Sequence, residues 1–169
     1  MKIENDFFRK YSILEIQYLL KNKTIKPLDI FKYSLKKINH HKKFKFLTSN
    51  SYNFLKKLNL KDKFNFNINR PLTCMPFLAK DIFNTKDFYT EMGSSIWKNF
   101  GAGNNARVID NLIDDGAILI GKSTTAEFAV HYETNCRNAL DSNRIPGTSS
   151  TGSAVSVALG VVPFALGTQ

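Results

Sequence analysis

Residues 145–160, IPGTSSTGSAVSVALG, combine a run of small and hydroxyl-bearing residues with a short apolar segment. The pattern over 153–159 predicts a buried helix. Glycine-rich loops before helices can bind phosphate, but a P-loop needs a Lys before its Ser/Thr, and none stands there. Two interpretations remain. One is a tight turn with a Ser/Thr cap, and the other is a catalytic serine whose small neighbours let substrate and backbone approach closely.

Apolar runs and helical patterns alternate in the chain around this stretch. Strands are predicted over 74–79, 117–120 and 161–166, and helices over 106–115, 124–131 and 153–159. Loops are expected over 84–105 and 132–148. Strands that alternate with helices are typical of a parallel sheet, so the expected fold class is α/β, a sheet covered by helices.

The first 70 residues predict helices instead. Ser12 is a suitable N-cap for a helix over 12–21, and Pro27 at the first position begins a second helix. A third helix is predicted over 52–60, before a polar linker, 61–71. We therefore expect one domain, made of a helical N-terminal segment (1–70) and an α/β core (71–169).

Positive charge is concentrated in the N-terminal part. The 169 residues have a formal net charge of +10, and residues 1–70 hold seventeen Lys and Arg against five Asp and Glu. A basic region can indicate a nucleic-acid partner. These lysines are spread along helical segments without clustered stacking aromatics, so composition alone favours no nucleic-acid partner.

Composition also argues against membrane, disulfide and metal-binding classes. No uncharged apolar run reaches 18 residues, and the N-terminus lacks the apolar core of a signal peptide, so no membrane span or membrane partner is expected. Cys74 and Cys136 are isolated thiols without a CxxC spacing, so neither a disulfide framework nor a metal site is expected. A reducing cytoplasm is the expected location.

Lys80 is a candidate base. It directly follows an apolar strand, at the carboxyl end where parallel sheets have their active sites. Desolvation there lowers the pKa of an ammonium group and makes a neutral amine available. The alternative is a surface lysine that begins a loop.

Two other patterns have ordinary structural interpretations. Residues 101–106, GAGNNA, fit a dinucleotide fingerprint, but the polar residues before them do not form the strand that it requires. His40 and His41 lack acidic or cysteine partners nearby, which indicates a solvated helix end. Glu127 and His131 are four residues apart, so they indicate a local pair or polar groups of a pocket.

Taken together, six segments resemble the amidase signature family in order and spacing. They are PLTCMPFLAKD (71–81), TEMGS (90–94), DGAILIGKS (115–123), AEFA (126–129), PGTSSTGSA (146–154) and GTQ (167–169). The resemblance implies a mixed β-sheet covered by helices. It also implies enzymes that hydrolyse or transfer carboxamides through a Ser–cis-Ser–Lys triad, without a metal or cofactor.

The resemblance assigns roles to individual positions. Lys80 corresponds to the base, and Ser149 to the bridging serine that passes a proton from the nucleophile to Lys80 and returns it to the leaving amine. The peptide bond before Ser149 is expected to be cis. The loop over 128–140, which leads toward Ser149, is expected to border the substrate pocket, with Phe128, Ala129 and His131 as substrate-binding residues.

This sequence departs from the family pattern in two places. Thr148 stands where the second of two glycines is usual. The family's nucleophilic serine lies in a Gly-Gly-Ser or Ala-Gly-Ser segment shortly after Gly-Thr-Gln, and this sequence ends at Gln169. We therefore expect a truncated chain that lacks the nucleophile and the oxyanion donors and is inactive alone.

Three functions are compatible with these features. The first is the N-terminal part of an amidase that hydrolyses a small-molecule amide. The second is the A subunit of a glutamyl-tRNA(Gln) amidotransferase, for which the basic N-terminal half and a tRNA-binding partner would be suitable. The third is a non-catalytic remnant. The sequence selects no particular amide, and it leaves a homo-oligomer open.

Overall fold

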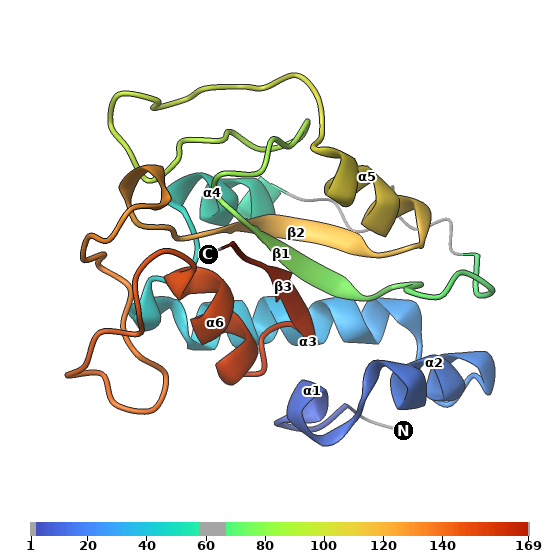
Figure 1. Ribbon diagram of the computed structural model, residues 1–169. Helices are drawn as coiled ribbons and strands as arrows, with labels where there is room; N and C mark the ends of the chain where they lie inside the picture. Colours follow the sequence, from blue (N-terminus) through green and yellow to red (C-terminus); the bar gives the residue numbers. More distant parts are fainter. Residues whose placement is uncertain (1–2, 58–66, 169) are drawn as a thin grey trace.

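The computed structural model describes residues 3–57 and 67–168 (Figure 1). Its helices and strands follow the chain as α1 (Phe7–Lys10), α2 (Ile13–Lys21), α3 (Pro27–His40), η1 (Lys42–Phe44), α4 (Ser49–Lys57), β1 (Pro76–Lys80), α5 (Arg107–Asp114), β2 (Ile118–Ser123), η2 (Glu127–Ala129), α6 (Thr151–Ala158) and β3 (Phe164–Leu166). The described part before residue 58 is therefore helical, and the strands follow it.

The N-terminal helices begin where the sequence predicts. Ser12 caps α2, because its hydroxyl accepts from the Glu15 amide while the Glu15 carboxylate accepts from the Ser12 amide. Pro27 occupies the first turn of α3, where its missing N–H costs no hydrogen bond. The third predicted helix is α4, but it begins three residues early. Its predicted end at 58–60, and 61–66 of the predicted linker, lie outside the described residues.

Three parallel strands form the sheet, in the order β2-β1-β3. β1 is central, and all five of its residues are buried. The prediction of an α/β fold with parallel strands is confirmed, and the described strands include no antiparallel member of the expected mixed sheet. An isolated antiparallel bridge joins Leu47 to Ser123 at the end of β2.

Helices cover both faces of the sheet (Figure 1). On one face Leu78 and Ile120 pack with Phe31 of α3 and Val155 of α6. On the other face, the buried residues Phe77, Ala79, Ile109 and Ala117 form a cluster that includes α5. β1 ends at Lys80, and the first turns of α6 lie at the carboxyl ends of β2 and β3, where the Ser153 hydroxyl bonds to Ser123 and to the Leu166 carbonyl.

The small residues of the 145–160 stretch allow α6 to approach the sheet closely. A Cβ placed on Gly152 would overlap the Phe46 carbonyl oxygen and the Thr124 nitrogen. The Gly152 amide instead donates to the Thr124 carbonyl at 2.9 Å. Glycine is therefore required at this crossing, because any side chain would push α6 away.

The predicted helix over 124–131 is wrong. The structure has only the short turn η2 there, with Phe128 and Ala129 in the left-handed region at φ 49° and 60°. The Phe128 amide donates to the Met92 carbonyl at 2.8 Å. Bonds to distant segments thus replace the local bonds of a helix, which a periodicity argument cannot detect.

None of the helices in the described part of the chain is both long and apolar enough to cross a membrane.

Candidate active site

Lys80 and Ser149 meet at the carboxyl end of β1. The Lys80 side chain is fully buried, and its amine donates hydrogen bonds to the Ser149 Oγ and, over 2.6 Å, to the Thr168 Oγ1. Ser149 lies in the turn before α6, and Thr168 follows β3. Three separate segments therefore converge on one amine.

The environment of Lys80 disfavours its charged form. Burial lowers the pKa of the Lys80 ammonium group below its usual value of 10.5. Its partners Ser149 and Thr168 offer hydroxyl groups, which can accept from an ammonium but provide no negative charge to stabilise it. An amine in this position can act as a base at a pH where an exposed lysine would be protonated.

Ser149 is held by backbone contacts on both sides. Its hydroxyl donates to the Ala129 carbonyl oxygen at 3.1 Å, and its own carbonyl accepts from the Thr125 hydroxyl at 2.9 Å. The next residue fixes Thr168, since the Ser150 Oγ accepts from the Thr168 amide at 2.9 Å and donates to the Thr168 carbonyl at 2.7 Å. The hydroxyl-rich run thus positions both partners of Lys80.

The expected cis bond before Ser149 is wrong for this structure. Within residues 3–57 and 67–168 no peptide bond is cis, so the Thr148–Ser149 bond is trans. A trans bond is favoured by about 3–4 kcal/mol before a residue other than proline. The turn is made instead at Gly147, whose φ of 97° suits glycine, and the Ser149 Oγ reaches the amine without the cis form.

The three residues predicted to bind substrate have different surroundings. Ala129 contacts Ser149 through its carbonyl oxygen. The Phe128 side chain is 43% exposed in the same turn. His131 is exposed, and its Nδ1 lies 2.9 Å from the Thr148 Oγ1, so it contacts the turn beside Ser149. The loop therefore borders the Lys80–Ser149 site.

Glu127 and His131 bond to different segments instead of to each other as a local pair. The Glu127 carboxylate accepts from the Ser94 hydroxyl at 2.6 Å, and His131 faces Thr148. Ser94 belongs to the TEMGS segment, so this bond joins that segment to η2. The 101–106 stretch follows turns at 97–100 and leads to α5, so no strand precedes it as a dinucleotide fingerprint needs.

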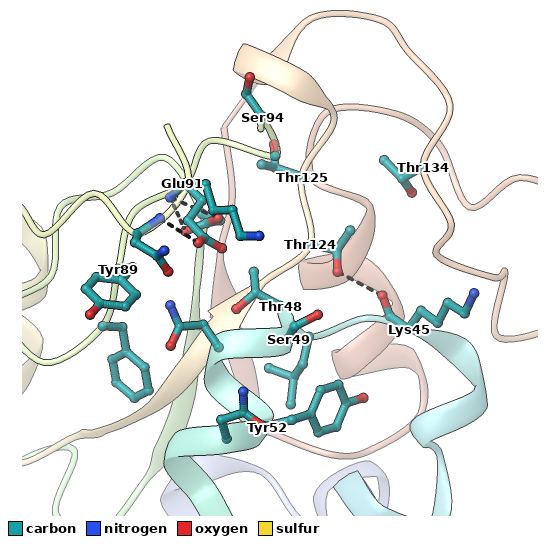
Figure 2. Close-up of a pocket in the computed structure, with 18 of the residues that line it drawn as sticks. Lys45, Thr48, Ser49, Tyr52, Tyr89, Glu91, Ser94, Thr124, Thr125 and Thr134 are labelled. Atoms are coloured by element: carbon teal, nitrogen blue, oxygen red, sulfur yellow. Dashed lines mark hydrogen bonds between the residues drawn. The ribbon is translucent and has the colours of Figure 1, made fainter. Parts of the chain in front are cut away.

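A wide groove lies next to the site. Its volume is about 1740 Å³, and its walls come from α4, the 86–101 loop and the 124–135 segment. Figure 2 shows Ser49 and Tyr52 on α4 and Thr48 directly before it, with Thr124 bonded to the Lys45 carbonyl nearby. Thr125 lines this groove, and its hydroxyl donates to the Ser149 carbonyl, so the groove adjoins the turn that carries Ser149.

Sequence reasoning missed Thr168 and Lys122 as residues of this region. Thr168 lies in the GTQ segment, to which the family resemblance assigns no role. Lys122 follows an apolar run as Lys80 does, so the signal that selected Lys80 could also have found it. The structure buries both lysines completely. Lys122 has a carboxylate partner, the Asp81 Oδ1 at 3.0 Å, whereas Lys80 forms no ion pair within residues 3–57 and 67–168.

Known proteins are similar to this chain in both sequence and fold. A family model described as Amidase matches residues 29–169. The A subunit of the glutamyl-tRNA(Gln) amidotransferase of Legionella pneumophila (strain Corby) is 32% identical over 167 residues, which cover 94% of this chain and 35% of that protein. The corresponding subunit of Coxiella burnetii (strain Dugway 5J108-111) is 45% identical over 104 residues, 58% of this chain and 22% of that protein.

A solved structure agrees with these sequence matches. The crystal structure of the corresponding subunit of Thermotoga maritima superposes with a TM-score of 0.73 and 25% identity, covering 92% of this chain and 33% of that chain. This chain thus spans about a third of the length of the Legionella and Thermotoga relatives. The match over 29–169 shows that the chain belongs to the amidase family.

Proposed function

We propose that the protein containing this chain cleaves carboxamide C–N bonds by serine acyl transfer, with Lys80 as base and Ser149 as proton relay. The observation that supports this proposal is the fully buried Lys80 amine hydrogen-bonded to the Ser149 hydroxyl. In such a pair, a neutral amine lies beside a hydroxyl group that can pass it a proton.

The proposed reaction conserves its protons. A serine oxygen attacks the carboxamide carbon, its proton passes to the Ser149 oxygen, and the Ser149 proton passes to the Lys80 amine. The C–N bond then breaks, and the proton returns from the Lys80 ammonium through Ser149 to the leaving nitrogen. Water or another acceptor releases the acyl group from the serine. For the first transfer the Ser149 hydroxyl must rotate from the Ala129 carbonyl toward Lys80.

We place the nucleophile in the Gly-Gly-Ser or Ala-Gly-Ser segment that follows Gly-Thr-Gln in the family. Phe128, Ala129 and His131 are proposed to border the bound amide, because Ala129 contacts Ser149 and His131 contacts Thr148. No metal or cofactor takes part in the proposed steps.

A second candidate function is that of the A subunit of a glutamyl-tRNA(Gln) amidotransferase. The supporting observation is that relatives of this name match 94% of the chain at 32% identity and part of it at 45%. The substrate amide would then be glutamine, and the released ammonia would be passed to an acceptor with a partner subunit present.

The test uses the full gene product that contains residues 1–169. Ammonia release is measured from glutamine and from a panel of small carboxamides, with and without glutamyl-tRNA(Gln) and the partner subunits of that system. Turnover of small amides alone supports the hydrolase, and turnover that requires the tRNA and partners supports the amidotransferase. No turnover under either condition overturns both and leaves the non-catalytic alternative.

Matched variants test the assigned groups. Lys80→Ala and Ser149→Ala should each lower kcat by at least about a hundredfold, a typical loss for an acid–base group. Lys32→Ala, a change of an exposed lysine on α3, is the control and should leave kcat unchanged. Retained activity in Lys80→Ala would refute Lys80 as the base.

A further inference from the structure

A second buried lysine lies beside the site without a role in the proposed reaction. The Lys122 side chain is fully buried on β2, and its amine lies 3.0 Å from the Asp81 Oδ1. It also donates to the Phe83 carbonyl and to the Thr90 hydroxyl, both at 2.8 Å. Asp81 is 1% exposed. A buried ion pair with this many bonds is costly to break from one side only.

The strand register relates this pair to Lys80. Ala79 is the partner of Lys122 across the strands, and Lys80 is the partner of Ser123. Because neighbouring side chains along a strand point to opposite faces, Lys122 and Lys80 lie on opposite faces of the sheet. Ser123 is bonded to Ser153 of α6, which identifies the face shared with Lys80. Asp81 thus follows Lys80 in sequence, yet its carboxylate is paired with Lys122 on the face opposite to Lys80.

Lys122 also fixes the turn that follows Lys80. The Lys80 carbonyl accepts from the amides of Ile82 and Phe83, at 2.7 and 3.0 Å, so the chain reverses immediately after β1. The Lys122 amine bonds to the Phe83 carbonyl at the end of this turn. The Asp81 carboxylate accepts from the Glu91 amide at 3.3 Å, which joins the turn to the 89–92 segment. Removing Lys122 would leave both the Phe83 carbonyl and the Asp81 carboxylate without this partner.

We propose that Lys122 is a positioning residue for Lys80: through its ion pair with Asp81 it holds the turn after β1 and neutralises, on the opposite face of the sheet, the carboxylate next to Lys80. The bonds of the Lys122 amine go to Asp81, Phe83 and Thr90 and, at 3.5 Å, to the Tyr89 carbonyl. Lys122 therefore acts through Asp81 and the turn. The kinetic part of this inference rests on the proposed role of Lys80 as base.

Charge effects give the proposal a specific signature. Burial raises the pKa of Asp81 to about 6 and lowers the pKa of Lys122, and the attraction between the two charges opposes both shifts. Glu91 is the other charged group that acts on both members of the pair. Without Lys122, we expect an Asp81 carboxylate that stays ionised to favour the protonated form of Lys80. When Asp81 carries no charge, we expect the unpaired Lys122 ammonium to disfavour the protonated form of Lys80.

The test follows the titration of Lys80 by ¹³Cε NMR in the full gene product and in three variants: Lys122→Met, Asp81→Asn and the double variant. The Lys80 resonance is identified by its loss in Lys80→Arg. We expect the midpoint to move up in Lys122→Met and down in Asp81→Asn, each by at least about 0.5 pH unit for a unit charge at short range inside a protein. The double variant should return toward the wild-type midpoint.

A merely structural role predicts a different result. It would lower the melting temperature of the variants and leave the Lys80 midpoint of the folded protein unchanged, or move it in the same direction in both single variants. Either result overturns the proposal. If Lys122→Met does not fold, the Lys80 midpoint in Asp81→Asn alone decides between the two roles. This variant retains the Lys122 bonds to Phe83 and Thr90.

Kinetics provide a second readout. If the Lys122→Met protein is folded at the assay temperature, its kcat should be lower than that of the wild type by at least about tenfold, and its KM should change by less than about threefold. The reason is that a misplaced base slows the chemical step more than it weakens substrate binding. Lys32→Met is the matched control. Wild-type kcat in a folded Lys122→Met protein overturns the inference. Absent turnover by the wild type overturns the proposed function instead, and the NMR titration still decides the role of Lys122.

Discussion

The Lys80 amine and the Thr168 hydroxyl are joined by a hydrogen bond of 2.6 Å, which connects the end of β1 to the second residue after β3. Thr168 is itself fixed by two bonds to Ser150, and Ser149 bonds to Lys80 directly. The turn before α6 therefore holds Lys80 both directly and through Thr168. The amine lies among oriented hydroxyl groups, and burial lowers its pKa below 10.5.

The buried Lys80 amine predicts a pH dependence of stability. Since burial lowers its pKa below 10.5, the unfolded chain binds more protons than the folded protein between that lowered pKa and 10.5. The free energy of unfolding contributed by this group therefore rises with pH in that window, and it is constant below it. Urea unfolding of the wild type and Lys80→Met, followed by circular dichroism at a series of pH values, measures the difference.

The difference between the two proteins isolates Lys80, because every other titrating group is common to both. Wild-type stability relative to Lys80→Met should increase toward pH 10.5. A difference that decreases with pH in that window would show that the folded protein stabilises the charged amine.

Much of the fold could be predicted because its elements have strong local signals. Ser12 and Pro27 mark the starts of α2 and α3, and the apolar runs that contain β1 and β2 end at Lys80 and Lys122. Parallel pairing follows from the alternation of strands with helices. The structure confirms these predictions, with boundaries that differ by a few residues.

What could not be predicted depends on contacts between distant segments. The 124–131 stretch has a helical pattern, yet Phe128 bonds to Met92 and the Ala129 carbonyl accepts from Ser149. The bonds of Lys80 to Ser149 and Thr168 span 69 and 88 residues, so no local pattern contains them. The family resemblance paired Lys80 with Ser149, but it also implied the cis bond that the structure does not have.

Gly152→Ala should destabilise the protein by about 3 kcal/mol, the upper part of the range for overpacking a core. The added methyl group would overlap the Phe46 carbonyl oxygen and the Thr124 nitrogen, which are backbone atoms and cannot rotate away. Chemical denaturation measures the change. Ala154→Ser, on the exposed side of α6, is the control and should change stability by less than about 0.5 kcal/mol. Equal effects of the two substitutions would contradict the close approach of α6.

Ser153→Ala should cost more stability than Ser123→Ala. The two hydroxyls lie 2.7 Å apart, and the Ser153 hydroxyl donates to the Leu166 carbonyl at 2.7 Å, so Ser123 must be the donor between them. Removing Ser153 deprives both Ser123 and Leu166 of a partner, a loss of about 1–3 kcal/mol for a buried group. Removing Ser123 leaves the bond to Leu166 intact. A double-mutant cycle by urea denaturation measures the stability loss of each variant. A larger loss for Ser123→Ala than for Ser153→Ala would contradict the prediction.

Cys74 and Cys136 should react slowly with thiol reagents in the folded protein. Their side chains are 1% and 3% exposed, and burial raises the pKa of Cys74 to about 12 and that of Cys136 to about 11. The reactive thiolate is therefore scarce at pH 8 and is shielded as well. Alkylation with iodoacetamide, followed by peptide mass spectrometry, should show modification at least about a hundredfold slower in native buffer than in urea. Rapid labelling of Cys74 in native buffer would contradict its place beside β1, where it packs in the same apolar cluster as Ile16, Leu20 and Met75.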